Sequence, residues 1–229
     1  MSDRTWERLG ALSGLVAAIL FGISFVIFLA TDPVGDVPDL ANAADEAGTY
    51  IADNQDELEI QVLLNSIAIV LFLWFLGGLW SRLRAAEGGP ARLSAIASAG
   101  GIAGAVAVLM GFVFEATAVL DPEAEVVGTL YVLAAMSIGL GGAAFTVFFL
   151  AAGKAILKSR GLPLVIGLLA FVAAAASALG LVSIFADDGI FNPATGAFGF
   201  WARFGAFVIW LVLASLALAV TAGRPVTRR

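Results

Sequence analysis

Apolar residues occur in long runs along this chain, and charged residues and helix breakers separate the runs. A helix needs about 20 apolar residues to cross roughly 30 Å of hydrocarbon. Breakers such as Asp32-Pro33 and Gly88-Gly89-Pro90 end runs of at least that length. Six runs qualify, approximately residues 9–30, 60–80, 93–119, 126–150, 162–185 and 198–221. The pattern predicts an all-α fold, a bundle of six transmembrane helices that forms a single domain over residues 1–229.

The composition supports a membrane location and excludes several chemistries. The chain is 61% hydrophobic and 13% charged, whereas charged residues make up about a quarter of a soluble domain. It contains no Cys and no His, which are the usual ligands of zinc, haem and iron–sulfur centres and the partners of Ser-His and Cys-His pairs. We therefore expect no metal site, no other cofactor and no catalytic residue.

The Lys and Arg residues indicate the orientation. If the N-terminus is cytoplasmic, all but Arg203 of the 12 basic residues fall in cytoplasmic segments, and most of the 18 acidic residues fall on the other side. Cytoplasmic loops hold the positive charge of membrane proteins, so both termini are predicted to be cytoplasmic. The first run is longer than the roughly 7–15 apolar residues of a cleaved signal peptide. We therefore expect a retained span in the cytoplasmic (plasma) membrane.

The distribution of charge also limits the partners. The basic residues are scattered in twos and threes and form no dense stripe, so nucleic-acid binding is not expected. Membrane lipids are the expected neighbours, and a small molecule or a lipid headgroup is a candidate ligand. A protein partner or a second copy of the chain remains an alternative.

The outer loop, residues 31–59, is acidic and begins irregularly. Farther along, apolar and small residues, together with one Asn, recur at three- and four-residue spacing, with most carboxylates elsewhere on the helical wheel. These positions are Leu40, Ala43, Ala47, Ile51, Asn54 and Leu58. The spacing predicts a short amphipathic helix in the loop. It could be a lid over an outer cavity, a rim that attracts cations, or a solvated connector.

Small residues recur at helical spacing within the predicted spans. Gly10 and Gly14, and Gly100 and Gly104, are each four residues apart, and Gly77-Gly78 lies in the second span. Small side chains allow membrane helices to approach closely. We interpret these positions as helix contacts within one chain, with a homo-oligomer seam as the alternative.

Two ionisable residues fall inside predicted spans, where charge is costly and indicates a functional site. Glu115 lies near the outer end of the third span, and Arg203 lies at a similar depth in the sixth, so they could form an ion pair. A stripe of small residues precedes Glu115 at helical spacing and predicts that its carboxylate faces the bundle interior. The stripe is Gly100, Gly104, Ala107 and Gly111.

Further polar side chains are predicted near this depth. Gln61 and Asn65 lie one turn apart in the second span, Tyr131 and Ser183 lie near span ends, and Ser24 lies deeper. One interpretation is an outward-facing ligand pocket around Glu115 and Arg203. The other is a buried polar network in which Asn65 and Tyr131 satisfy the charged pair and fix helix register.

Three stretches carry a resemblance to a known group of proteins. They are residues 50–55 (YIADNQ), 70–80 (VLFLWFLGGLW) and 82–93 (RLRAAEGGPARL). Over residues 45–110 the chain resembles a family of small, uncharacterised multi-span membrane proteins of high-GC bacteria, a domain of unknown function. The resemblance implies the multi-span architecture and no activity.

Three functions remain open at this stage. The first is a binding or transport-related protein with a polar pocket around Glu115 and Arg203. The second is a structural or accessory subunit that docks a partner. The third, a lipid-modifying enzyme, is disfavoured because no nucleophile–base pair is evident. No charged residue is predicted near the membrane midplane, which counts against a charge-coupled pump.

Overall fold

The computed structural model describes residues 3–31 and 37–223, and this part of the chain is helical without strands. The predicted breaker Asp32-Pro33 and the basic residues Arg224, Arg228 and Arg229 lie outside the described residues. The α-helices are α1 (Asp3–Thr31), α2 (Ala43–Asp53), α3 (Gln55–Glu87), α4 (Arg92–Leu120), α5 (Val127–Ser159), α6 (Leu164–Leu179) and α7 (Ala202–Thr221).

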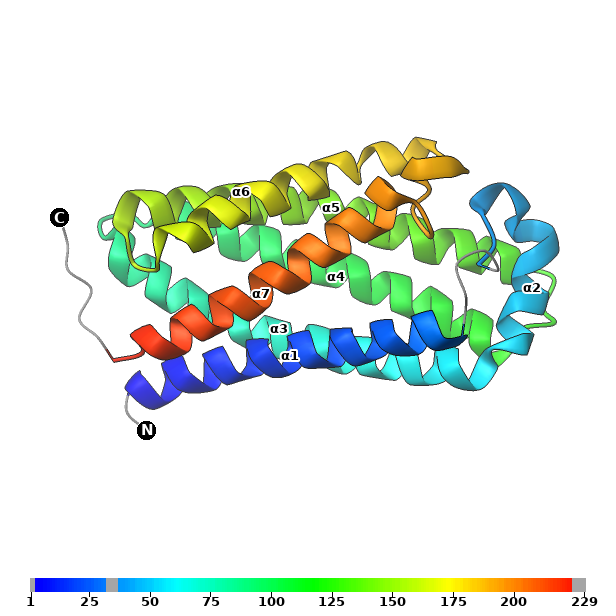
Figure 1. The fold of residues 1–229 in the computed structure, drawn as a ribbon, viewed down its shortest axis with the longest axis horizontal. Helices are drawn as coiled ribbons and strands as arrows, with labels where there is room; N and C mark the ends of the chain where they lie inside the picture. The colour runs from blue at the N-terminus through cyan, green and yellow to red at the C-terminus, as the bar shows by residue number, and fades with distance from the viewer. Residues whose placement is uncertain (1–2, 32–36, 224–229) are drawn as a thin grey trace.

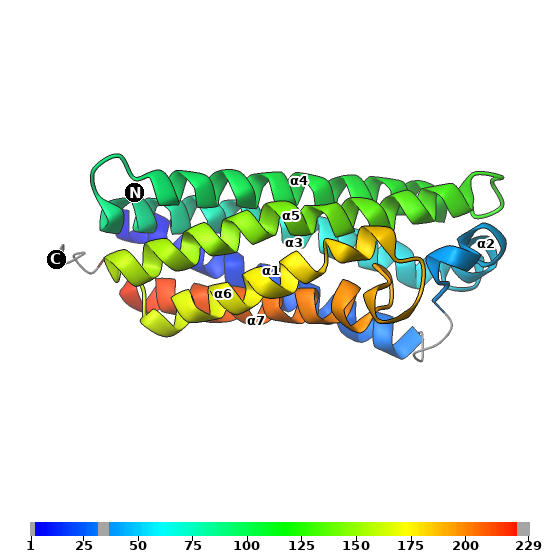
Figure 2. The same cartoon turned by 90° about the horizontal axis from the view of Figure 1, so that it is seen from above.

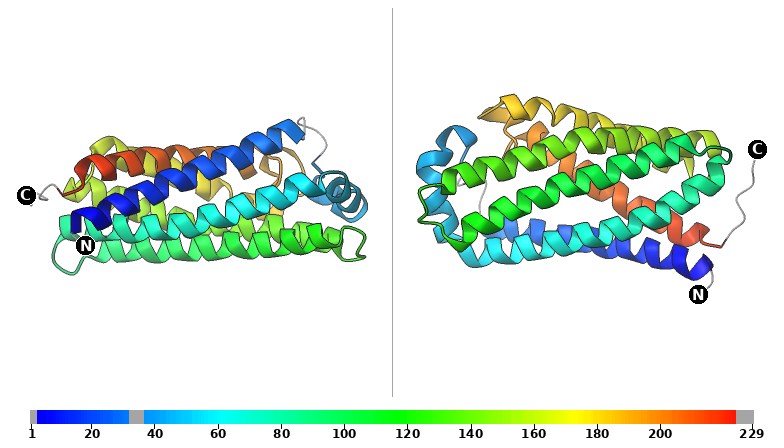
Figure 3. Two further views of the ribbon diagram at one scale, coloured as in Figure 1. Left: turned by 90° about the horizontal axis from the view of Figure 1, so that it is seen from below. Right: turned by 180° about the vertical axis from the view of Figure 1, so that it is seen from behind.

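All helices except α2 run along the long axis of the molecule (Figure 1). Helix α4 packs along α5 and α1 packs along α3, while α7 contacts both α1 and α6 (Figure 3). Figure 2 shows α4 and α7 on opposite sides of the bundle. The arrangement leaves the space between α1, α3, α5 and α7 to be filled by side chains.

The two ends of the described chain meet at one end of the bundle. The backbone N–H of Gly223 donates a hydrogen bond of 2.7 Å to a carboxylate oxygen of Glu7. We call this the terminal end and the opposite end, where α2 lies across the bundle (Figure 1), the α2 end.

Six helical segments in the described part of the chain are long and apolar enough to cross a membrane. Large apolar side chains point outward along them, and Val26, Leu63 and Val172 are about 60% exposed (63%, 59% and 61%). Such a surface is unfavourable in water and suits contact with lipid. The fold is therefore consistent with a multi-pass membrane protein.

The last two apolar segments are less regular than the sequence predicts. Regular α-helix ends at Leu179 in α6, and a 3₁₀ turn over Val182–Phe185 completes the predicted span. A π-helical turn, Ala197–Trp201, precedes α7. Pi turns inside helices are rare and frequent at functional sites, and this one places Arg203 at the first turn of α7.

Glycines mark the closest helix contacts. A Cβ added at Gly10 would lie 3.1 Å from the Cα of Gly78, so α1 and α3 almost touch there. On the other side, a Cβ added at Gly100 would lie 2.7 Å from the backbone nitrogen of Phe148. Both positions were interpreted from the sequence as helix contacts, and the structure confirms that they pack within one chain.

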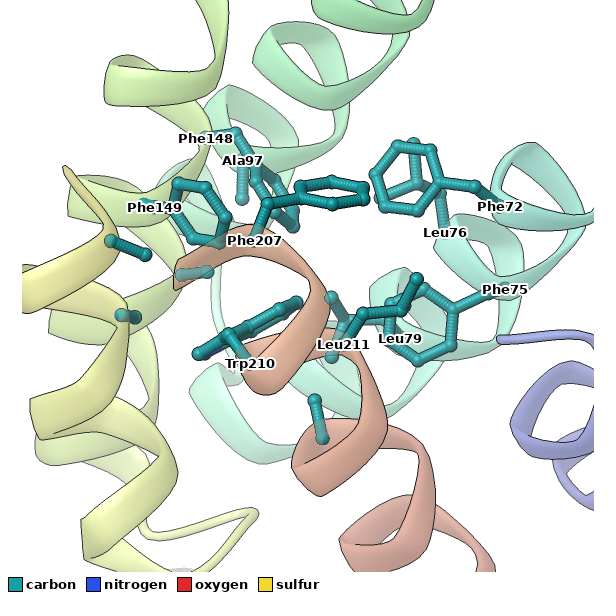
Figure 4. Packing of buried hydrophobic residues seen from close by; sticks show 14 of the residues in the cluster. Phe72, Phe75, Leu76, Leu79, Ala97, Phe148, Phe149, Phe207, Trp210 and Leu211 are labelled. Carbon is teal, nitrogen blue, oxygen red and sulfur yellow. The ribbon is translucent and has the colours of Figure 1, made fainter. Parts of the chain in front are cut away.

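Aromatic rings fill the middle of the bundle. Phe72, Phe148, Phe149 and Trp210 are at most 1% exposed, and Figure 4 shows them converging from α3, α5 and α7. The ring centroids of Phe149 and Trp210 are 5.2 Å apart and the rings are nearly perpendicular. Edge-to-face pairs of this kind are favourable, so the middle of the bundle is a packed aromatic core.

Polar contacts close the terminal end. The carboxylate of Glu87 accepts hydrogen bonds from the backbone N–H groups of Leu93 and Ser94, at 3.0 and 2.9 Å, and thereby caps α4. Arg82 donates from Nε to the carbonyl oxygen of Gly161 at 3.1 Å. These contacts satisfy backbone groups at helix ends that would otherwise lack partners.

Candidate functional site

Two neighbouring cavities lie between the aromatic core and the α2 end. The first, of about 140 Å³, is lined by Arg203 and is here called the Arg203 cavity. The second, of about 160 Å³, is lined by Glu115 and is called the Glu115 cavity. Gln61 and Asn65 line both, together with Phe28, Phe112, Ile138 and Phe200. The shared walls make the two cavities adjacent parts of one region.

Glu115 lies on the same face of α4 as the stripe of small residues. Gly100, Gly104 and Gly111 face α5, where an added Cβ would meet Phe148, Phe145 or the carbonyl oxygen of Ala134. Glu115 lies one turn beyond Gly111, is half-buried and lines the Glu115 cavity. Within the described residues its carboxylate has no hydrogen-bond or ion-pair partner.

Arg203 is buried more completely and is partly satisfied. Its side chain is 8% exposed, and Nη1 donates to the carbonyl oxygens of Ile138 and Gly139 at 3.1 Å each. The other terminal nitrogen, Nη2, is buried without a hydrogen-bond partner in the described part of the chain. The guanidinium is thus held against α5 with one donor group unused.

The two charged residues do not pair with each other. Among the described residues no ion pair joins Glu115 and Arg203, and each lines a different cavity. The reason is local, because the backbone carbonyls of α5 draw the guanidinium toward Ile138. The hypothesis of a buried Glu115–Arg203 network therefore does not describe this structure.

Of the candidate residues near span ends, Tyr131 lines a cavity and Ser183 does not. The Tyr131 hydroxyl donates to the carbonyl oxygen of Pro38 at 2.8 Å, and the ring lines the Glu115 cavity. Ser183 lines neither cavity, and its hydroxyl donates to the carbonyl oxygen of Gly180. The 3₁₀ turn after α6 turns Ser183 back onto its own backbone, which accounts for its separation from the other candidate residues.

Gln61, Asn65 and Ser24 are brought together. Ser24 and Gln61 are 4% and 7% exposed and line the Arg203 cavity with Asn65. The side chains of these three residues have no hydrogen-bond partner within residues 3–31 and 37–223. An amide both donates and accepts, so Gln61 and Asn65 leave unused hydrogen-bonding capacity in the walls of the cavities.

The aromatic lining of the Arg203 cavity was not predicted from the sequence. The Arg203 cavity is lined by Phe21, Phe25 and Phe28 of α1 and by Phe200, Phe204 and Phe207 at the start of α7 and before it. Both triplets have the spacing i, i+4, i+7, which places each on one helix face. That repeated spacing was a signal in the sequence for two aromatic faces.

Side chains far apart in the sequence close the α2 end over the cavities. Asn192 donates from Nδ2 to a carboxylate oxygen of Asp39 at 2.7 Å, and the Thr195 hydroxyl donates to the same oxygen at 3.1 Å. The backbone N–H of Ala41 donates to the carbonyl oxygen of Asp187. We call these contacts the Asp39 latch, because they join the segment before α2 to the segment before α7.

The arrangement suits binding. Apolar cavities with a few polar groups are typical of small-molecule sites, and here a cation, a carboxylate and two amides line adjacent spaces. Where the structure describes the chain, no group of three or more Asp or Glu side chains could hold a metal ion. Comparisons with protein-family models, curated proteins and solved structures found no match.

Proposed function

We propose that this protein binds a small molecule within the membrane, in the Arg203 and Glu115 cavities, as a binding or transport-related protein. The observation that carries the proposal is Nη2 of Arg203, which is buried without a partner among the described residues in a cavity that Gln61 and Asn65 also line. Buried polar groups are normally hydrogen-bonded because leaving them unpaired is costly. A ligand that supplies the missing partners would offset that cost.

The chemical groups in the cavity walls indicate which kind of ligand would fit. Gln61 and Asn65 offer amide donors and acceptors to both cavities, and Phe28 and Phe200 offer apolar surface. A ligand that fits would combine an apolar body with a few hydrogen-bonding groups. Glu115 contributes a carboxyl group to one of the two adjacent spaces, and Arg203 contributes a guanidinium to the other.

The orientation of the protein is part of the proposal. Arg82, Arg84, Lys154 and Lys158 lie toward the terminal end of their helices, and acidic residues lie in and beside α2. Positive charge is retained in the cytoplasm, which supports a cytoplasmic terminal end. The cavities would then lie in the outer half of the cytoplasmic membrane, beneath the segment that contains α2.

The absence of Cys from the chain makes the orientation directly testable. Ala52 in α2 and Ala85 near the end of α3 are both exposed, so Ala52→Cys and Ala85→Cys form a matched pair. In intact cells, a thiol reagent that cannot cross the membrane should label the Ala52→Cys variant alone. Labelling of the Ala85→Cys variant alone would overturn the orientation.

Ligand binding is tested by thermal stability. The purified protein should gain stability from at least one compound of a broad metabolite and lipid library, because a ligand that binds only the folded state raises its melting temperature. The gain should disappear in Asn65→Leu, which alters the wall between the cavities. It should persist in Asn54→Leu, which changes the same side chain at a site that lines neither cavity.

The screen can also contradict the proposal. A library without a stabilising compound, combined with no co-purified small molecule in mass spectrometry of the native protein, would be evidence against a binding function. A stabilising compound whose effect is equal in Asn65→Leu and the wild type would place the ligand elsewhere. Either result would leave the fold intact and remove the function assigned to the cavities.

A further inference from the structure

The cation in the Arg203 cavity has no anion. Arg203 is 8% exposed, and within the described residues no carboxylate lies within ion-pair distance of its guanidinium. Nη1 is satisfied by two backbone carbonyls, whereas Nη2 is buried and unpartnered. A buried charge is costly unless an opposite charge and hydrogen bonds compensate it.

Neighbouring glycines make room for this arrangement. A Cβ added at Gly180 of the α6 end would lie 3.1 Å from Cδ of Arg203, and one at Gly142 would lie 3.5 Å from Nη1. The Arg203 side chain therefore packs against both glycines, where larger residues would crowd it. The π turn before α7 ends at Trp201, two residues before Arg203. The two hydrogen bonds of Nη1 hold the guanidinium against α5.

The rest of the Arg203 cavity is uncharged. Ser24 and Ser177 contribute hydroxyls, Gln61 and Asn65 contribute amides, and most of the remaining wall is phenylalanine. An inorganic anion would lose its hydration here and gain little from the rings. A molecule with an apolar part would gain contact with the rings while its anionic end meets the guanidinium.

We propose that Arg203 binds the oxyanion, a carboxylate or a phosphate, of an amphiphile whose apolar part lies among the phenylalanines of the Arg203 cavity. The proposal rests on the proposed function and specifies its ligand class. Guanidinium is suited to oxyanions because its planar donors match their geometry. The acceptor oxygen would supply the partner that Nη2 lacks, while the contacts of Nη1 to α5 keep the side chain positioned.

The experiment measures equilibrium binding of radiolabelled decanoate to the full-length protein in nanodiscs. Decyl phosphate should compete for the site, whereas decanol and decyltrimethylammonium, which lack an anionic head, should not. Acetate and inorganic phosphate should not compete either. Competition by acetate or phosphate alone would show a site for a small soluble anion and overturn the amphiphile assignment.

Variants test the role of Arg203. Arg203→Gln should abolish decanoate binding, and Arg203→Lys should weaken it by about tenfold or more because an ammonium lacks the planar pair of donors. Arg84→Gln removes one positive charge from an exposed position near the end of α3 and should leave the affinity unchanged within about twofold. Unchanged affinity in Arg203→Lys and Arg203→Gln would refute the proposal.

A variant at another residue keeps the proposal testable if Arg203→Gln does not fold. Ser24→Leu narrows the same cavity without removing a charge and should also weaken decanoate binding. Decanol could also bind, with its binding lost in Asn65→Leu and retained in Arg203→Gln. That result would overturn the oxyanion proposal, but the proposed function would remain supported. Failure of decanoate, decyl phosphate and decanol to bind would overturn the amphiphile proposal alone, because the proposed function is tested by the broad library.

The source of the amphiphile is resolved by the nanodisc lipid. If phosphatidylglycerol in place of an uncharged glycolipid without phosphate reduces decanoate binding in the wild type and not in Ser24→Leu, the oxyanion belongs to a membrane lipid. If lipid exchange has no effect while decanoate and decyl phosphate still bind, the oxyanion belongs to a free amphiphile. Both results support recognition of an oxyanion by Arg203.

Discussion

The same helices pack closely in the aromatic core and leave cavities toward the α2 end. In the core, Phe148, Phe149 and Trp210 are at most 1% exposed and their rings contact one another. Toward the α2 end, the same helices leave cavities of about 140 and 160 Å³, lined in part by polar side chains. The same helices are therefore closely packed in the core and leave space toward the α2 end, where we propose that a ligand binds.

The polar groups of the two regions also differ, although the buried hydroxyl of Ser215, beside the core, has no partner among the described residues either. In the core, the indole N–H of Trp210 donates to the carbonyl oxygen of Ile166 at 3.1 Å. At the cavities, Nη2 of Arg203 and the amides of Gln61 and Asn65 have no partner in the described part of the chain. A stable protein pays for such groups at functional sites. Substitutions in the two regions should therefore differ in their effect on stability.

The largest loss of stability is expected from truncation in the aromatic core. Phe148→Ala should lower the free energy of unfolding by about 3 kcal/mol or more, because a buried ring is replaced by a cavity. Titration with sodium dodecyl sulfate in mixed micelles measures this change. Phe185→Ala, at an 88% exposed position, should change it by less than about 0.5 kcal/mol. Equal effects would contradict a specially packed core.

A smaller loss is expected where α4 meets α5. Gly100→Ala should cost about 2 kcal/mol, since its Cβ would lie 2.7 Å from the backbone nitrogen of Phe148 and the helices would have to separate. Gly205→Ala is the control, because nothing lies within 4 Å of its added Cβ. It should be neutral or stabilising by up to about 1 kcal/mol. The same titration compares them, and a neutral Gly100→Ala would contradict close contact.

Loosening of the α2 end should have a local effect. Asn192→Ala removes both the donor to Asp39 and the acceptor of the Ala194 N–H, which we expect to cost about 1–3 kcal/mol. Hydrogen exchange should accelerate in residues 186–196 and remain slow in the aromatic core. Thr195→Val, which removes one hydrogen bond to Asp39, should have a weaker effect. Equal acceleration of hydrogen exchange throughout the bundle would show that the Asp39 latch stabilises more than the α2 end.

The smallest change is expected in the cavity walls. Asn65→Leu should leave the unliganded protein unchanged or stabilise it by up to about 1 kcal/mol, because it removes a polar group without a partner. Ser94→Ala is the contrast, since the Ser94 hydroxyl is bonded to Glu87 and Ala91 and its loss should cost about 1 kcal/mol. Thermal unfolding without ligand compares the two. A similar loss in both would assign Asn65 a structural role.

The sequence alone indicated the helices and one face of the site. Hydrocarbon thickness fixes the length of an apolar run that can span it, so six runs predicted six apolar helical segments, which the structure has. The helical period fixes which residues share a face, so the glycine stripe correctly predicted that α4 packs through Gly100 and Gly104 and that Glu115 faces inward.

Which faces meet was decided only by the tertiary structure. Equal depth allowed an ion pair between Glu115 and Arg203, but depth does not specify direction around a helix axis. The π turn before α7 and the free lone pairs of the Ile138 and Gly139 carbonyls direct Arg203 toward α5. The contact between Asp39 and Asn192 joins residues 153 positions apart, and no local pattern encodes such a distance. Periodicity constrains one helix at a time, whereas a site between helices depends on how all of them pack.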